Sequence, residues 1–183
     1  MRRIVLKFGL ISGVLSSVMM LITVPFEDQI GFGHSLIIGY TTIVASFLLV
    51  YFGIRSYRNN VGGGRISFGR AFAVGISITL ITCVFYIVTW ELLYFFVMPD
   101  YLVKYSAYVI QQARAAGASE AAIQAKTLEL QKSADAYENP LVNVAMTFIE
   151  PFPVGLLITL ISAAVLRRKA GPQTAPSALP ASS

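Results

Sequence analysis

The chain has 183 residues, of which 56% are hydrophobic and 13% are charged. Its mean hydropathy of +0.69 is too high for an ordinary soluble domain and excludes that class. The formal net charge of +5 arises in loops beside apolar runs, so it indicates no nucleic-acid partner.

Four apolar runs follow one another along the chain, over residues 8–25, 35–54, 71–97 and 141–166. Each is long enough to cross a hydrocarbon core, which takes about 20 helical residues. Backbone groups in lipid must be hydrogen-bonded within the segment, so the runs are expected to be helices. The sequence therefore predicts an all-α membrane protein, with a four-transmembrane-helix bundle over residues 1–169 and the lipid bilayer as its surroundings.

Basic residues mark alternate ends of these runs, and none of the nine carboxylates lies among them. They are Arg2, Arg3, Lys7, Arg55, Arg58, Arg65, Arg70, Arg167, Arg168 and Lys169. Lysine and arginine are retained on the cytoplasmic side during insertion. The pattern thus predicts a multi-pass protein of the cytoplasmic membrane with both termini in the cytoplasm, and a disordered cytoplasmic tail over residues 170–183, where Pro, Ala and Ser predominate.

The loop over residues 55–70 is predicted to be cytoplasmic and contains three consecutive glycines at 62–64. It lacks the Lys-Ser/Thr pair of a phosphate-binding loop and does not follow a strand. We therefore expect a turn between two helices and no nucleotide partner.

A polar insert over residues 99–139 separates the third and fourth runs and divides at Gly117. Helical spacing on both sides predicts two short helices on the outer face. Tyr101, Tyr105 and Tyr108 share one helical face and are candidate anchors for a protein partner. The same tyrosines are equally compatible with resting at the membrane interface.

Three glutamates fall near the outer edge of the hydrocarbon, counting about 1.5 Å per residue from the basic ends of the spans. They are Glu27, Glu91 and Glu150. Side chains that face inwards would form an acidic vestibule, which could bind a cation or pass a proton. The alternative is that these carboxylates simply emerge into headgroup water beside the aromatic belt.

Glu150 is followed by Pro151 and Pro153. Proline disfavours helical geometry at the residue before it, so the fourth span is expected either to break at Glu150 or to kink there.

Small residues recur every fourth position on three of the runs. The rows are Gly9, Gly13 and Ser17; Gly75, Thr79 and Cys83; and Gly155, Thr159 and Ala163. Such rows let helix backbones approach closely in lipid. We expect packing within one chain, with a homodimer face as the alternative.

His34 is the only histidine, so a histidine-based metal site or catalytic triad has too few members. No catalytic, metal-ligating or cofactor-binding residue is predicted, no cofactor is expected, and the protein is not expected to be an enzyme.

Several stretches together resemble a bacterial family of uncharacterised membrane proteins, domain of unknown function 4199. They are GIRSYR at 53–58 with GGGRISFGRAF at 62–72, GASE at 117–120, and PVGL at 153–156 with LISA at 160–163. The likeness runs from about residue 4 to 169. It implies a four-helix integral protein of bacterial inner membranes, and it implies no activity and no functional residues.

The sequence favours a non-enzymatic accessory or interaction module, whose partner would be another membrane protein or a second copy. The alternative is a small transporter, or a cation- or proton-binding membrane protein, that uses Glu91 and Glu150.

Overall fold

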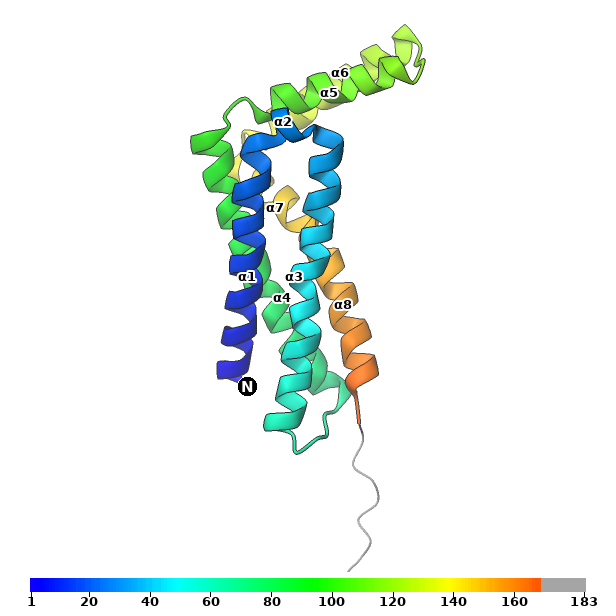
Figure 1. Cartoon of the computed structure of the whole chain (residues 1–183). Helices are drawn as coiled ribbons and strands as arrows, with labels where there is room; N and C mark the ends of the chain where they lie inside the picture. The colour runs from blue at the N-terminus through cyan, green and yellow to red at the C-terminus, as the bar shows by residue number, and fades with distance from the viewer. Residues whose placement is uncertain (169–183) are drawn as a thin grey trace, which may run out of the picture.

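A computed structural model describes residues 1–168, which fold into a bundle of long helices (Figure 1). The predicted tail over residues 170–183 lies outside the described residues. The long helices are α1 (Arg2–Thr23), α3 (Phe32–Asn60), α4 (Phe68–Leu92), and α7 (Pro140–Ile149) followed by α8 (Pro151–Leu166). Within residues 1–168 the only β pairing is an isolated bridge between Ile66 and Arg168.

Shorter elements join and extend these helices. A 3₁₀ turn (Val24–Phe26) and α2 (Glu27–Ile30) connect α1 to α3, and a π-helical turn (Leu93–Val97) extends α4. The polar insert forms α5 (Tyr101–Ala115) and α6 (Glu120–Tyr137). Gly117 between them has φ of 77°, a conformation that glycine adopts readily and allows the tight reversal.

Four segments are long and apolar enough to cross a membrane. They are Arg2–Phe26, Phe32–Asn60, Phe68–Val97 and Pro140–Leu166. Large apolar side chains remain exposed on each of them, for example Val14, Leu48, Val84 and Leu157. Exposed apolar surface of this kind is suited to lipid rather than water. The predicted all-α fold with four transmembrane helices is confirmed.

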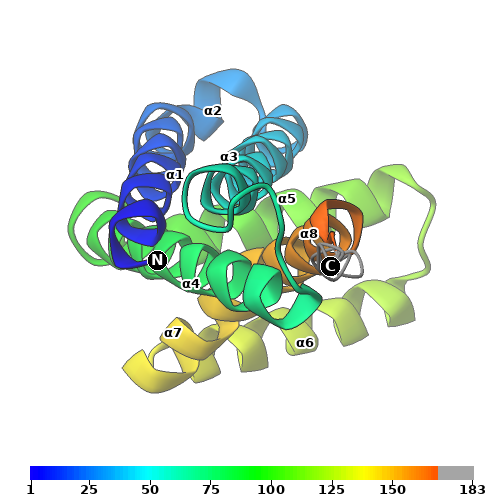
Figure 2. The same ribbon diagram turned by 90° about the horizontal axis from the view of Figure 1, so that it is seen from below.

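The two ends of the bundle differ in composition (Figures 1 and 2). The N-terminus, the loop at residues 61–67 and the end of α8 lie together at one end, which we call the basic end. At the opposite end, α2 connects two spans, and α5 with α6 forms a helical hairpin that reaches beyond the bundle. We call this opposite end the lid end.

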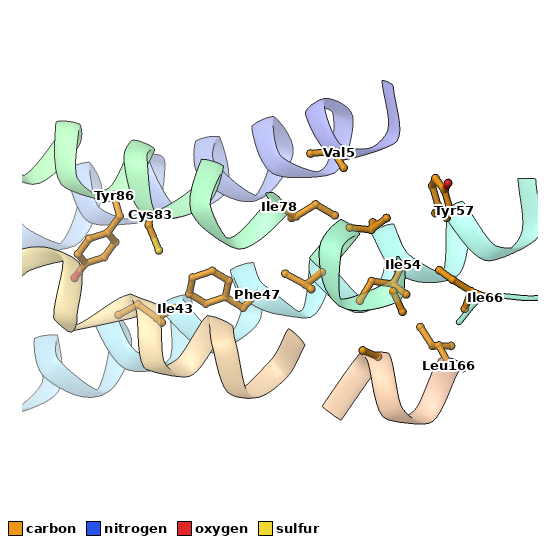
Figure 3. Packing of buried hydrophobic residues seen from close by; sticks show 14 of the residues in the cluster. Val5, Ile43, Phe47, Ile54, Tyr57, Ile66, Ile78, Cys83, Tyr86 and Leu166 are labelled. Atoms are coloured by element: carbon orange, nitrogen blue, oxygen red, sulfur yellow. The ribbon is translucent and has the colours of Figure 1, made fainter. Parts of the chain in front are cut away.

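The half of the bundle nearer the basic end is filled by apolar side chains (Figure 3). Phe47, Val50 and Ile54 of α3 pack with Val74 and Ile78 of α4, and none of them is more than 1% exposed. The interior between these side chains is close-packed.

The rows of small residues bring helices of the same chain into close contact. A Cβ atom added to Gly13 would lie 2.6 Å from the Phe85 ring of α4, and one added to Gly155 would lie 2.5 Å from Cγ2 of Thr79. The Thr79 hydroxyl also lies 3.0 Å from the Thr159 hydroxyl. The small residues of α1 and α8 are thus used for packing against α4.

The fourth span is interrupted at Glu150, between α7 and α8. Glu150 keeps helical dihedral angles, φ −70° and ψ −60°, so the chain bends here without unwinding. Pro151 at the start of α8 has no amide hydrogen to donate to the preceding turn, which favours a bend at this point. The two helices diverge from this bend (Figure 2), which turns Glu150 towards the interior of the lid end.

Candidate functional site

A cavity of about 340 Å³ lies between the helices at the lid end. Residues from every span and from the α5–α6 hairpin line it. They are Ser16, Met19, Met20, Thr23, Val24, Glu27, Ser35, Leu36, Gly39, Tyr40, Thr42, Ile43, Tyr86, Trp90, Tyr101, Leu102, Tyr105, Tyr137, Thr147 and Glu150. The cavity thus lies between all four candidate membrane spans and is covered by the polar insert.

Glu150 lies on the α7–α8 side of the cavity and is paired with a tyrosine of α4. The Tyr86 hydroxyl donates a hydrogen bond of 2.8 Å to Oε2 of Glu150. Figure 3 shows Tyr86 reaching from α4 towards the α7–α8 segment, close to Ile43. Although Glu150 occupies the cap position of α8, its side chain makes no cap hydrogen bond, so the carboxylate is directed to the cavity rather than to its own helix.

Glu27 of α2 lines the same cavity and is only 8% exposed. Tyr101, at the start of α5, is affected by both carboxylates. Burial raises the pKa of the Tyr101 hydroxyl, and the negative charges of Glu27 and Glu150 raise it further. Both carboxylates thus act on the same tyrosine of the cavity wall.

Glu91 does not line the cavity. Its Oε1 atom is buried and has no hydrogen-bond partner within residues 1–168. Of the three glutamates in the predicted acidic vestibule, the structure brings Glu27 and Glu150 to one cavity and leaves Glu91 outside it.

The three tyrosines of the predicted partner surface pack against one ring at the start of α3. Phe32 stacks on Tyr108 with ring centroids 5.1 Å apart, and the Tyr101 and Tyr105 rings each lie 6.3 Å from it. All three tyrosines are partly buried. Tyr101 and Tyr105 also line the cavity, so this face of α5 serves as its cover.

A chain of hydrogen bonds fixes α6 to the bundle. Trp90 Nε1 donates to the Tyr137 hydroxyl at 3.0 Å, and this hydroxyl lies 3.1 Å from that of Thr147. Thr147 in turn donates to Oδ1 of Asn143 at 3.3 Å. Burial raises the pKa of Tyr137, while its hydrogen bonds with Thr147 and Trp90 act in the opposite direction.

Ser35 contributes a polar group with no partner. The residue is 4% exposed and lines the cavity, and its Oγ is buried without a hydrogen bond within residues 1–168. A buried hydroxyl without a hydrogen-bond partner costs free energy. A bound molecule that hydrogen-bonds to it would therefore gain binding free energy.

The charges of the cavity are one-sided. No Lys, Arg or His is found among its described lining residues, while two carboxylates are. Within residues 1–168 no three His, Cys, Asp or Glu side chains gather as metal ligands would. The arrangement can hold a positively charged molecule among hydroxyl groups and aromatic rings.

Sequence reasoning did not select Tyr86, Trp90, Tyr137 or Ser35 as site residues. Tyr86 and Ser35 are polar residues within apolar runs, which is a usable signal because such residues tend to face the bundle interior. Nothing in the sequence indicates the hydrogen bond between Trp90 and Tyr137.

These features define a class, a four-helix integral membrane protein with an acidic, aromatic-walled cavity beneath a helical lid. The chain belongs to the family described as Protein of unknown function (DUF4199), which matches residues 7–168 and confirms the resemblance seen in the sequence. Searches of curated proteins and of solved structures gave no match.

Proposed function

We propose that this protein is a non-enzymatic accessory module that binds a positively charged ligand in the cavity at its lid end. The observation that carries the proposal is that Glu27 and Glu150 line one cavity, with no basic residue among its described lining residues. Glu150 is hydrogen-bonded to the uncharged Tyr86 hydroxyl, and a cationic ligand would supply the counter-charge that a carboxylate at membrane depth requires.

The closed inner end of the cavity favours a binding module over a transporter. On the basic side of Ile43 and Tyr86, the interior is filled by Phe47, Val50 and Ile78, each no more than 1% exposed. Alternating access requires a second opening beside the site. The packing around Phe47 would have to separate for such an opening to form.

We further propose that the protein lies in a bacterial inner membrane with both termini in the cytoplasm. The support is the distribution of charge along the bundle. Arginine is concentrated at the basic end, in the loop at residues 61–67 and its flanks, whereas the carboxylates of the spans lie nearer the lid end. A ligand would then reach the cavity from the outer side.

Trp90 provides a direct test, because it is the only tryptophan in the chain and lines the cavity. The full chain in lipid nanodiscs would be titrated with chloride salts of sodium, potassium, magnesium, calcium, tetramethylammonium and benzyltrimethylammonium, with sodium benzoate as the anionic comparison. We expect a saturable change in tryptophan fluorescence with at least one cation and none with benzoate.

Two variants identify the carboxylate responsible. Glu150→Gln should weaken the binding of that cation at least about tenfold, because the variant removes the charge that the ligand meets. Glu91→Gln is the matched control, since Glu91 lies outside the cavity, and it should bind as the natural chain does. Equal losses in both variants, or no response to any cation, would overturn the proposal.

A further inference from the structure

We infer that the bound cation is an organic ammonium ion with hydrophobic substituents, not a metal ion. This inference rests on the proposed function and adds to it the chemical class of the ligand. It is carried by the composition and size of the cavity wall, in which charge is scarce and aromatic and apolar surface is plentiful.

The cavity wall offers few carboxylate ligands for a metal ion. Calcium takes six to eight oxygen ligands, and magnesium requires near-octahedral geometry. Glu27 and Glu150 are the only carboxylates among the described lining residues, and no group of three His, Cys, Asp or Glu side chains that could hold a metal ion occurs within residues 1–168. The wall therefore offers a divalent metal ion two carboxylates at most.

Aromatic rings supply the surface that an ammonium ion would contact. Those that line the cavity are Tyr40, Tyr86, Trp90, Tyr101, Tyr105 and Tyr137. Tyr101 and Tyr105 stack with an interplanar angle of 6°, and Tyr101 meets Trp90 edge-on with centroids 4.9 Å apart. Ring faces attract ammonium groups, and quaternary ammonium ligands are bound in aromatic cages of this composition.

The remaining wall is apolar and adaptable. Met19, Met20, Leu36, Ile43 and Leu102 supply it, and unbranched methionine side chains fit ligands of irregular shape. The volume of about 340 Å³ lies within the range of small-molecule pockets, roughly 300–1,000 Å³. A bare inorganic ion would leave most of this space and all of this apolar surface unused.

Ser35 adds a second and independent sign of a ligand. Its buried, unpartnered Oγ points to a polar atom that is supplied from outside the chain. An N–H group or a hydroxyl on the substituents of the ammonium ion would complete its hydrogen bonding.

The test compares ligands that differ in one property at a time, with Trp90 fluorescence as the readout. Benzyltrimethylammonium should bind at least about tenfold more tightly than tetramethylammonium, because its ring adds buried apolar area. Neopentylbenzene, its neutral isostere, should give no saturable change. Tyr101→Leu should weaken benzyltrimethylammonium binding roughly three- to tenfold through the loss of an aromatic face.

Gly39 allows the cavity to be filled without touching either carboxylate. A Cβ atom added there meets nothing within 4 Å, and the residue lines the cavity. Gly39→Leu should abolish benzyltrimethylammonium binding, whereas Gly39→Ala should retain it. This pair keeps the inference testable even if Glu150→Gln fails to fold.

The outcomes separate the two proposals. Binding of inorganic cations alone, with loss in Glu150→Gln, would overturn the organic-cation inference and leave the proposed function standing. Equal binding of the neutral isostere would also overturn the inference, because charge would then contribute nothing. Failure of every cation would overturn both.

Discussion

Gly155 and Gly39 show how differently two glycines can be placed in one bundle. At Gly155 the α8 backbone approaches α4 so closely that an added Cβ would lie 2.5 Å from Cγ2 of Thr79 and 2.7 Å from the Phe47 ring. Gly39 faces open space. The first glycine is required for packing, and the second leaves volume in the cavity.

Gly155→Ala is therefore predicted to destabilise the protein by about 1–3 kcal/mol, the usual cost of overpacking a close contact. Gly39→Ala should be neutral or stabilising by up to about 1 kcal/mol, since alanine favours a helix more than glycine does. Unfolding in mixed micelles at increasing dodecyl sulfate measures both variants. Equal stability of the two would contradict the close α4–α8 packing.

At the scale of single residues, the sequence identifies candidate site and packing residues but does not show which way their side chains face. The rows that contain Gly13 and Gly155 are recognisable because their spacing is helical. Glu91 illustrates the limit. Successive helical residues are about 100° apart, so with Trp90 facing the cavity the next residue is turned away from it. In a uniformly apolar run nothing indicates which of the two faces inwards.

Among the elements, α5 contacts the bundle through its tyrosines. Tyr108 stacks on Phe32, and its hydroxyl would lie 3.2 Å from a Cβ atom added to Gly33. Together with the Trp90–Tyr137 hydrogen bond of α6, these contacts close the lid end. The hairpin is therefore docked at its base, and its tip at Gly117 extends away from the spans.

Phe32→Ala is predicted to loosen α5. An aromatic pair contributes about 0.5–1.5 kcal/mol beyond its buried area, so amides in the first turns of α5 should exchange roughly two- to tenfold faster. Hydrogen exchange read by mass spectrometry measures this directly. Phe96→Ala is the control, because Phe96 is 80% exposed and should leave α5 unchanged. Unaltered exchange in Phe32→Ala would show that other contacts hold the lid.

The elements themselves were largely predictable, and their junctions were not. Length and hydropathy identify the four spans, and Gly117 with a capping serine at Ser119 separates α5 from α6; Ser119 Oγ accepts a hydrogen bond from Ala122 at 3.3 Å. The bend at Glu150 was open between a break and a kink. In the structure the span bends without unwinding, and Tyr86 on another helix donates a hydrogen bond to the Glu150 carboxylate at the bend.

The whole molecule combines a solid half with a hollow half. Towards the basic end, β-branched and aromatic side chains fill the interior, as around Ile54 and Ile78. Towards the lid end, the divergence of α7 from α8 and the short α2 connection leave the cavity. The orientation proposed from the charges places the close-packed half on the cytoplasmic side and the cavity on the outer side.

That orientation is tested with single added cysteines, because the one natural cysteine, Cys83, is fully buried and should not react. Ala116→Cys lies at the exposed tip of the hairpin, and Asn60→Cys lies at the basic end. A membrane-impermeant maleimide should label Ala116→Cys in right-side-out vesicles and Asn60→Cys in inverted ones, since arginine-rich ends stay in the cytoplasm. The reverse pattern would place the cavity mouth on the cytoplasmic side, and its ligand would then have to be an intracellular cation.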